Sequence, residues 1–386
     1  MKYIKMMARA IGLKVVYSKL RDILLKLRGF NLLNADQTTA FMAPYEVKSI
    51  PGASAWLPQV VNCGDNEINI FPKKESFTDK VYVWEYQGTG KNAQLSKYGA
   101  VIVEQKILCT DWNYSSFYKD IWKKDERAIK SSPAAIALFS QFQDGIFYGG
   151  YYDFVFLVLT KLCRIKDALP LLDLSDIVIS YPLFNAQYET EYMQLLGVNT
   201  TNLTDSTKHK VVTPYLVTAN SAHWYPNLAD LLSLKRHIGA AFQPVESERN
   251  RIYISRSGRR CITNEDELMT LLQKYDFLII ADKPRTVTEQ ISMYYNASFI
   301  IGPHGASFSN IIWCRPGAHL FELFSPNYAP DFFLYLAAMM DMQYSAYYEG
   351  VADSKIDYTE GLVEDILVSI PKLEACLNNI FKGTPN

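Results

Sequence analysis

The sequence predicts an α/β protein of two Rossmann-like domains, in which helices cover both faces of parallel sheets. With 386 residues, the chain is longer than one ordinary domain core requires. Hydrophobic residues make up 49% of it, which indicates well-buried globular domains. Strand-like and helix-like patterns alternate along the chain, as they do when helices connect parallel strands.

The second half of the chain shows this alternation most clearly. Strands are expected at 251–255, 277–280, 299–301 and 319–323, and helices at 265–274, 287–295 and 306–313. This order is typical of a doubly wound domain, which binds ligands beyond the carboxyl ends of its strands. We therefore expect a C-terminal α/β domain at 216–350, followed at 351–386 by a terminal helix that packs back across the domains.

The first half predicts a second α/β domain, at 31–215. Its expected strands are 80–86, 99–104, 176–180 and 215–218, and its expected helices are 132–143, 152–164 and 192–196.

Residues 1–30 predict a basic amphipathic helix. They hold eight Lys or Arg residues and one Asp, a net charge of 8 − 1 = +7 in a chain whose total is −1. One interpretation is an anchor on an anionic inner membrane leaflet. The other is a helix packed on the protein body with a solvated basic face.

The remaining composition excludes several classes. The total charge of −1 does not indicate a nucleic-acid partner. The six cysteines are scattered without C-x-x-C spacing, so we expect reduced thiols and no metal site. Neither a transmembrane run nor a signal-peptide pattern is present. We therefore expect a cytoplasmic protein, with possible peripheral contact with the inner membrane face.

Three arginines follow the strand at 251–255. Arg256, Arg259 and Arg260 lie within five residues of one another, just beyond the end of this strand. Guanidinium groups bind phosphate oxygens in a two-point geometry, so this cluster fits a pyrophosphate. The alternative is a set of surface arginines in a turn.

The third strand of this domain ends in Gly302-Pro303-His304-Gly305-Ala306-Ser307, just before a helix. Glycines allow a ligand to approach the backbone, and a helix amino terminus attracts anions. His304 would face the ligand or serve in packing, and Asn310 would contact the ligand or cap the helix locally. Glu322, near the end of the next strand, would accept hydrogen bonds from a ribose or sugar, or pair with an arginine.

Five motifs of the second half resemble, in order and spacing, the signature of family-61 glycosyltransferases. They are R-I-Y-I-S-R (251–256), R-R-C-I-T-N-E (259–265), T-E-Q-I (288–291), I-G-P-H-G-A-S-F-S-N (301–310) and P-G-A-H-L-F-E-L (316–323). That family includes bacterial capsular-polysaccharide biosynthesis proteins, plant xylan arabinosyl- and xylosyltransferases and animal O-linked N-acetylglucosaminyltransferases. The resemblance is strong over 216–345 and weaker over 149–162.

The resemblance implies a GT-B fold, in which two domains face each other across a cleft. Region 31–215 would bind the acceptor, and 216–350 the nucleotide sugar, usually UDP-linked. It further implies inversion at the anomeric carbon, no obligatory metal and no other cofactor. Arg256 and Arg260, with Arg259 beside them, would hold the diphosphate. The turn from His304 through Gly305 to Ala306, and Asn310, would shape the donor pocket, and Glu322 would face the nucleoside.

The chain departs from the family in the first domain. Where the family usually carries a histidine, the segment Gly149-Gly150-Tyr151-Tyr152-Asp153-Phe154 has Asp153. An inverting transfer needs a base for the acceptor hydroxyl, so we expect Asp153, together with His304, to be catalytic. Alternatively, Asp153 caps the helix that begins there, or the protein is an inactive relative.

The leading functional hypothesis is an inverting glycosyltransferase that moves a sugar from a nucleotide sugar to a glycan or lipid-linked glycan in capsular or other surface-polysaccharide biosynthesis. Two alternatives stay open. One is a pyruvyl- or phospho-sugar transferase of surface-glycan assembly. The other is a non-catalytic assembly partner that binds sugar nucleotides.

Overall fold

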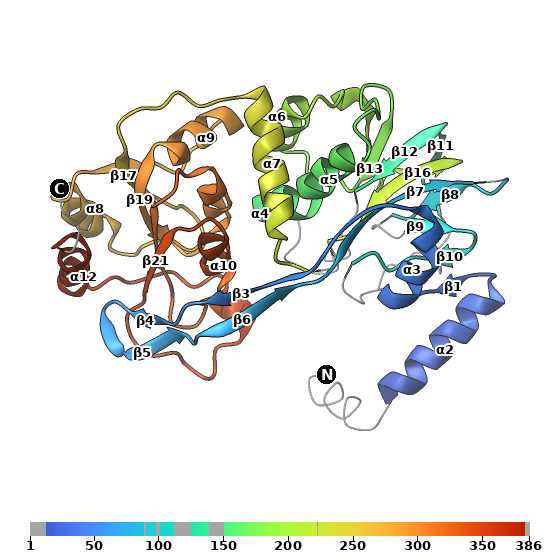
Figure 1. Ribbon diagram of the computed structural model, residues 1–386. Coiled ribbons are helices and arrows are strands. Elements are labelled where there is room, and N and C mark those ends of the chain that lie inside the picture. The colour runs from blue at the N-terminus through green and yellow to red at the C-terminus, as the bar shows by residue number, and fades with distance from the viewer. Residues whose placement is uncertain are drawn as a thin grey trace. The chain divides into compact units, whose positions relative to one another are not determined.

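The computed structural model describes residues 13–88, 90–97, 101–111, 125–138, 150–221 and 223–382 (Figure 1). The chain forms two compact units. Unit 1 contains Met1–Gly52 and Asp79–Ser233, and unit 2 contains Ala53–Thr78 and Leu234–Asn386. Both combine helices with parallel strands, which confirms the predicted α/β class.

The units differ in extent from the predicted domains. Their boundary lies between Ser233 and Leu234, inside helix α7 (Leu228–Ala241), rather than at 215/216. Residues 53–78, which we assigned to the first domain, belong to unit 2. The reason is strand pairing, because β4 (Val60–Asn62) pairs with β21 (Gln343–Tyr347).

Unit 2 is built on one sheet with the strand order β18-β17-β19-β20-β21-β4-β5. Its strands run parallel from β18 to β4, and β5 is antiparallel to β4. The other strands of the sheet are β5 (Asp65–Phe71), β17 (Asn250–Ile254), β18 (Phe277–Ile280), β19 (Ala297–Pro303) and β20 (His319–Leu323). A separate ribbon pairs β3 (Ala53–Leu57) with β6 (Lys74–Thr78). The helices are α8 (Glu265–Gln273), α9 (Val287–Tyr295), a 3-10 helix (Ala306–Trp313), α10 (Phe332–Met339), α11 (Tyr358–Gly361) and α12 (Ile370–Lys382).

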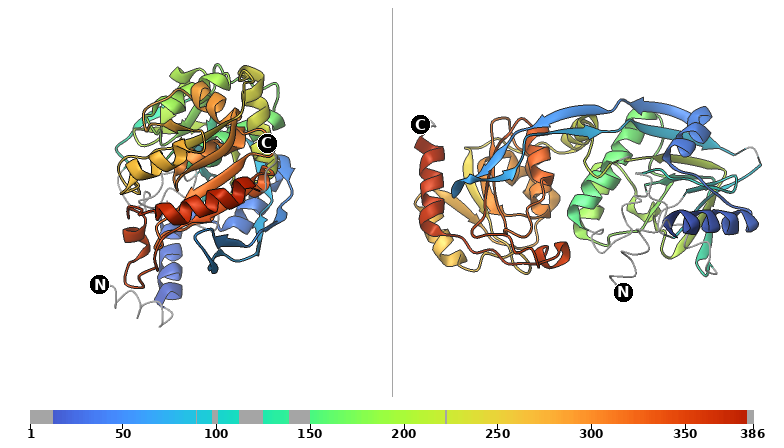
Figure 2. Two further views of the ribbon diagram at one scale, coloured as in Figure 1. Left: turned by 90° about the vertical axis from the view of Figure 1, so that its left-hand side faces the viewer. Right: turned by 90° about the horizontal axis from the view of Figure 1, so that it is seen from below.

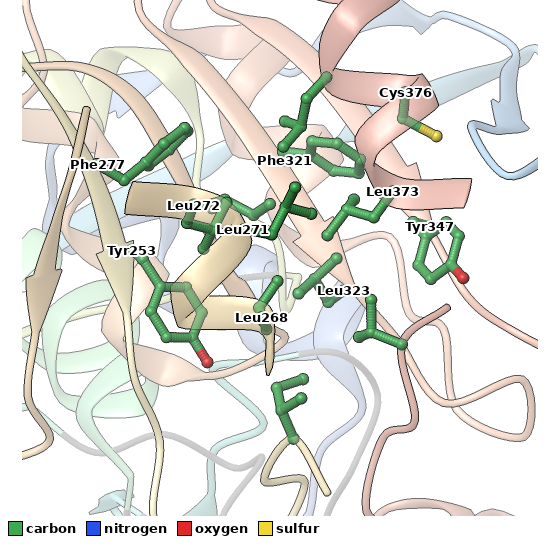
Figure 3. Packing of buried hydrophobic residues seen from close by; sticks show 14 of the residues in the cluster. Tyr253, Leu268, Leu271, Leu272, Phe277, Phe321, Leu323, Tyr347, Leu373 and Cys376 are labelled. Atoms are coloured by element: carbon green, nitrogen blue, oxygen red, sulfur yellow. The ribbon is translucent and has the colours of Figure 1, made fainter. Parts of the chain in front are cut away.

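The core of unit 2 joins α8 and α12 to the sheet. In Figure 3, leucines of α8 point toward residues of the strands and of α12. The buried members shown include Leu268, Leu271, Leu272, Phe277, Phe321, Leu323 and Leu373. The α8 leucines recur at helical spacing, so one face of that helix is removed from water. Figure 2 shows α12, in red, beside α8, in gold, as the contacts between them also indicate.

Unit 1 contains two sheets, with strand orders β14-β13-β12-β16-β7-β2 and β1-β10-β9-β8-β15-β11. The first has β2 (Glu46–Ile50), β7 (Val81–Gln87), β12 (Ala134–Ala137), β13 (Val178–Tyr181), β14 (Leu203–Asp205) and β16 (Tyr215–Ala219). The second has β1 (Asn31–Leu32), β8 (Ala93–Leu95), β9 (Val101–Val103), β10 (Lys106–Ile107), β11 (Ala128–Ser131) and β15 (His209–Thr213). The helices are α2 (Leu13–Leu27), α3 (Ala35–Met42), α4 (Tyr151–Asp153), α5 (Thr160–Ala168) and α6 (Gln187–Leu195), with a π-helical stretch (Phe154–Leu159) joining α4 to α5.

Two predicted helices need correction. The helix predicted at 132–143 is wrong in its first half, because this part forms β12, which lies between the parallel strands β13 and β16. Residues 139–143 lie outside the described part of the chain. Alanine favours helices, but pairing on both sides overrides this propensity. The terminal helix begins only at Ile370, followed by a proline in its first turn, and it packs against α8 in the core of unit 2.

The predicted N-terminal helix is present as α2 over Leu13–Leu27, with residues 1–12 outside the described part. Figure 1 shows α2 extending from the rest of unit 1. Near its end, Leu25 is buried against Ile102 and Ile107. Four apolar side chains remain exposed at the spacing of one helix face: Leu20, Ile23, Leu24 and Leu27.

Candidate functional site

The carboxyl ends of β17, β19 and β20 bring four predicted site residues together. Arg256 and Arg260 follow β17, His304 follows β19, and Glu322 lies near the end of β20. Because these strands are parallel neighbours, their ends meet at one edge of the sheet. This is the edge at which a doubly wound sheet binds its ligands.

The carbonyl of His304 holds both arginines. Arg256 Nη1 donates to it at 2.9 Å and Arg260 Nε at 3.1 Å. A second carbonyl fixes each guanidinium: Arg256 Nε donates to Arg259 O at 2.8 Å, and Arg260 Nη1 to Leu362 O at 2.6 Å. The two charges are therefore positioned before any ligand binds.

Part of this cluster is available to a ligand. Among the described residues, Arg256 Nη2 and the exposed Arg259 side chain make no hydrogen bond. Burial lowers the pKa of Arg256, and the charge of Arg259 lowers it further. Because arginine keeps its proton, the lowered pKa means that holding the Arg256 charge in this buried position beside Arg259 costs electrostatic free energy. A bound anion would offset that cost.

Gly305 makes room for the Arg256 guanidinium. Its backbone is extended, with φ at −178°, so its role is not conformational freedom. A β-carbon there would lie only 1.7 Å from Arg256 Nη1, closer than any contact allows. Gly305 is also the N-cap of the 3-10 helix that begins at Ala306, and it has no side chain to cap the first turn.

His304 and Glu322 form a buried pair. His304 Nδ1 lies 2.7 Å from Glu322 Oε1, and Tyr344 Oη donates to Glu322 Oε2 at 2.7 Å. Among the described residues, the hydrogen-bond partners of this carboxyl are therefore His304 and Tyr344, not an arginine. His304 Nε2 has no hydrogen bond in the same part of the chain, which leaves this atom for a ligand.

Electrostatics favour the neutral form of both members. Burial lowers the pKa of His304 well below its usual value, and the charges of Arg260 and Arg256 lower it further. Burial raises the pKa of Glu322 well above its usual value, against the opposing hydrogen bond from Tyr344. A protonated Glu322 would donate to Nδ1, so the proton of the neutral imidazole would lie on Nε2.

Replacing Glu322 by Gln tests this protonation state. In the wild-type protein, the raised pKa of Glu322 means that the folded state keeps a proton which the unfolded chain releases above about pH 4.3. The protonated Glu322 therefore contributes to stability at low pH, and this contribution is lost as the pH rises through the pKa of the folded state. Glutamine mimics the protonated acid without titrating. We expect the Tm of Glu322→Gln relative to wild type to increase by roughly a few degrees between pH 5 and pH 8.

The matched control is Glu265→Gln, which changes a half-buried carboxylate that accepts from Tyr253 Oη at 2.6 Å. Thermal unfolding of both variants across this pH range gives the comparison. A Glu322→Gln difference that stays flat or falls with pH would show that Glu322 is ionised in the folded protein.

Arg260 has an unusual backbone for an arginine. Its φ is +58°, in the left-handed region that non-glycine residues rarely adopt, and its side chain is buried. The guanidinium lies 5.3 Å from the ring centroid of Tyr328, which also contacts the His304 ring. Residues with such a backbone gather at functional sites, because the surrounding structure must stabilise them.

Two other predicted site residues occupy different settings. Asn310 is buried in the 3-10 helix, where its Nδ2 donates to Gln290 Oε1 at 2.9 Å and to Ser307 O at 3.1 Å. These contacts join the 3-10 helix to α9, which fits the local role left open for Asn310. Asp153 belongs to unit 1 and is buried there. Its Oδ2 accepts from the Gly150 N–H at 3.0 Å, so it caps α4, as the alternative interpretation predicts.

Sequence reasoning missed Tyr344 and the aromatic surroundings of His304. The ring of Phe324 stacks on His304 at 5.2 Å, and Phe333 lies at 5.1 Å. Tyr344 lies on β21, next to β20, and the first four residues of Q-Y-S-A-Y alternate between polar and less polar side chains, as in a strand. That alternation could have placed Tyr344 in the sheet, but only strand pairing shows which carboxyl it reaches.

Comparison with known proteins identifies the family. Residues 151–321 match the family model described as Glycosyltransferase 61. Over these residues the chain belongs to the glycosyltransferase 61 family. The matched region contains Asp153, Arg256, Arg260 and His304, and ends one residue before Glu322.

A search of curated proteins gives no match. Among solved structures, the chain is similar to the crystal structure of the dodecameric iron-containing heptosyltransferase TibC in complex with ADP-D-β-D-heptose. The two share 9% sequence identity over 78% of this chain and 96% of that chain, with a TM-score of 0.33.

Proposed function

We propose that the protein is an inverting glycosyltransferase that transfers a sugar from a nucleotide sugar, most simply a UDP-sugar, to a glycan or lipid-linked glycan of a capsular or other surface polysaccharide. One observation carries the donor assignment. Within the family-61 region, two arginines are held in place by the His304 carbonyl at the ligand-binding edge of the sheet, and Arg256 Nη2 is left without a partner among the described residues.

In this proposal the arginines neutralise the departing diphosphate, and no metal is required. Arg256 and Arg259 present guanidinium N–H groups to the phosphates. His304 Nε2–H donates a further hydrogen bond to the donor, and Glu322 fixes the ring through Nδ1. The preorganised charges stabilise negative charge as it develops on the leaving group.

Asp153 is the proposed base for the acceptor hydroxyl. In an inverting reaction this proton leaves as the acceptor oxygen attacks the anomeric carbon and the bond to the diphosphate breaks. Asp153 lies in the first turn of a helix that continues as the π-helical stretch Phe154–Leu159. Such π-helical turns occur often at functional sites, which supports this position.

Release of UDP in the absence of acceptor tests the donor assignment. The protein is incubated with a panel of UDP-sugars, and free UDP is measured over time, with protection against heating as the binding assay. Steady UDP release supports the proposal, and the most rapidly hydrolysed donor identifies the sugar. If neither UDP nor other nucleotides raise the Tm, both the transferase and the sugar-nucleotide-binding partner are excluded.

The alternatives give different results in the same assay. A non-catalytic assembly partner would bind UDP without turnover across donors and acceptors. A pyruvyl- or phospho-sugar transferase would use the arginine and histidine pocket without a nucleotide sugar.

We further propose that α2 binds a cytoplasmic, anionic membrane surface, where lipid-linked acceptors would be reached. Within the described residues, no helix is long and apolar enough to cross a bilayer. The exposed stripe of Leu20, Ile23, Leu24 and Leu27 supports contact with the interface, and the surrounding basic residues favour anionic lipids.

Replacing Leu24 and Leu27 together by Asp should weaken binding to anionic vesicles by about 100-fold, because each buried leucine contributes roughly 1.5 kcal/mol. Co-sedimentation with phosphatidylglycerol vesicles at low and high salt measures this binding, which should fall as salt rises. Leu171→Asp, at a fully exposed leucine of unit 1 outside α2, serves as the control. Undiminished binding after deletion of residues 1–30 would exclude the anchor.

A further inference from the structure

Unit 2 contains a contact between two thiols from distant parts of the chain. Cys63 lies in the two-residue turn that joins β4 to β5, and Cys376 lies on the buried face of α12. The Cys376 thiol donates a hydrogen bond to the Cys63 sulfur. In Figure 3 the sulfur of Cys376 points away from the leucines of α8. Neither cysteine takes part in the donor site described above.

The turn that carries Cys63 is fixed against β21. The Cys63 backbone N–H donates to the Ala346 carbonyl at 3.0 Å. A β-carbon on Gly64, the second residue of the turn, would lie 2.4 Å from the Tyr347 ring, so the turn packs directly on this ring. The Tyr347 hydroxyl accepts from the Ser369 N–H at 3.0 Å, just before α12 begins. Tyr347 therefore contacts both the turn and the start of α12, which keeps the two thiols together before any reaction.

The surroundings of Cys63 favour its thiolate form. The hydrogen bond from Cys376, with others from the Ser345 hydroxyl and the backbone of Ala346, lowers the pKa of Cys63 to about 7, although burial opposes this. The same contact raises the pKa of Cys376, because the thiol that donates must keep its proton. Since the thiolate is the nucleophile in thiol chemistry, Cys63 is the attacking member of the pair.

A pocket beside β21 gives small molecules a route to Cys63. Cys63 is partly exposed, and it lines a half-open pocket of about 350 Å³ together with Ser345, its hydrogen-bond partner. Leu334 and Ala338 of α10 contribute apolar lining. Among the described residues of the lining, Asp341 alone is charged, so the pocket disfavours an anion beside the thiolate and suits a small neutral molecule.

Cys261 provides a comparison within the same unit. It is also partly exposed, but its hydrogen bond with Asp365, burial and the Asp365 charge all raise the pKa of its thiol. Cys261 is therefore protonated near neutral pH, and a protonated thiol is a poor nucleophile.

We propose that Cys63 is a modification site for a neutral low-molecular-weight disulfide, with Cys376 as the resolving thiol. The Cys63 thiolate attacks one sulfur of the small disulfide, whose S–S bond breaks and releases one thiolate. Cys376 then attacks the Cys63 sulfur, while its proton passes to the second departing thiolate. The product is a Cys63–Cys376 disulfide that joins the β4–β5 hairpin to α12. The two cysteines lose two electrons, which the small disulfide gains.

Mass spectrometry of the full-length protein tests both steps. The reduced protein is incubated with bis(2-hydroxyethyl) disulfide, quenched with acid and digested. In wild type we expect a Cys63–Cys376 disulfide and an unmodified Cys261. Cys376→Ala should instead accumulate the mixed disulfide on Cys63, and Cys63→Ser should form neither product. Cys261→Ser is the matched control and should give the wild-type product.

A brief reaction with iodoacetamide at pH 7 measures the activation of Cys63 separately. About half of Cys63 is thiolate at its pKa of about 7, so Cys63 should be alkylated at least about 10-fold faster than Cys261 in the folded protein. In denaturant the two rates should become similar, because the contacts that separate the two pKa values are lost.

The disulfide should also raise the Tm by roughly 5–10 °C, because it closes a loop that spans most of the chain. Dithiothreitol should reverse this rise, and Cys63→Ser should not show it. A wild-type pair that stays reduced under excess disulfide would overturn the inference, as would equal modification of Cys261 and Cys63. The wild-type measurements need no substitution, so they decide the question even if a variant folds poorly. None of them uses a nucleotide sugar, so they are independent of the proposed glycosyl transfer.

Discussion

Arg256→Ala is expected to lower the affinity for UDP by roughly 10- to 100-fold, the effect of losing charge-assisted hydrogen bonds of about 1.5–3 kcal/mol. UDP release from a UDP-sugar should fall further, because Arg256 would also stabilise charge on the departing diphosphate. Arg260 still donates to the His304 carbonyl in this variant, so the turn keeps one of its two arginine contacts. Calorimetric titration with UDP and the release assay measure the two effects.

Arg251→Ala is the control for this experiment. Arg251 lies near the start of the same strand, at the opposite end from Arg256, where Nη1 donates to Tyr275 O and the guanidinium contacts the Phe381 ring. It should cost some stability and leave UDP affinity within about twofold of wild type, as expected for a distant site. Arg256→Lys keeps the charge but loses the planar fork, so its affinity should be intermediate. Equal UDP affinity in Arg256→Ala and wild type would exclude the diphosphate role.

Asp153→Asn should reduce sugar transfer by about 10²- to 10⁴-fold, the contribution expected of a general base. Asparagine retains an oxygen that can accept from the Gly150 N–H, so the cap on α4 is preserved. Affinity for UDP and Tm should therefore stay close to those of wild type. Transfer to an acceptor, UDP titration and thermal unfolding are measured on the same preparation.

Asp153→Ala removes the cap and the base together, and provides the comparison. We expect it to lose transfer as Asp153→Asn does, and to lose about 1 kcal/mol of stability in addition. If Asp153→Asn transfers sugar at the wild-type rate while Asp153→Ala is only less stable, Asp153 is a helix cap and another group removes the proton.

The sequence predicted unit 2 well wherever its structure depends on short segments. The bounds of β18, α9 and β20 agree with prediction, since their patterns are short and clearly punctuated. Arg256, Arg260, His304 and Glu322 were also placed together correctly, because parallel strand ends share one edge. No local pattern could place β4 beside β21, however, or Tyr344 beside Glu322.

Local propensity was misleading at β12, where small apolar residues predicted a helix. Pairing with β13 and β16 on either side makes this segment a strand, and neither partner is adjacent in sequence. The role of Asp153 was undecided for a similar reason. Capping depends on the first turn of α4 alone and could be proposed from the sequence, whereas a catalytic role depends on what the chain binds.

The placement of residues 53–78 in unit 2 affects the order in which the protein can mature. During synthesis, this segment leaves the ribosome long before β21, the strand with which β4 pairs. The hydrogen bond from the Asn62 side chain to the Tyr348 carbonyl joins residues 286 positions apart in the sequence. The β4–β5 hairpin must therefore wait, unpaired at one edge, until almost the whole chain has been synthesised. A fragment that starts at Leu234 would lack this hairpin and leave the edge of β21 open to association, so unit 2 needs two separate segments of the chain to complete its sheet.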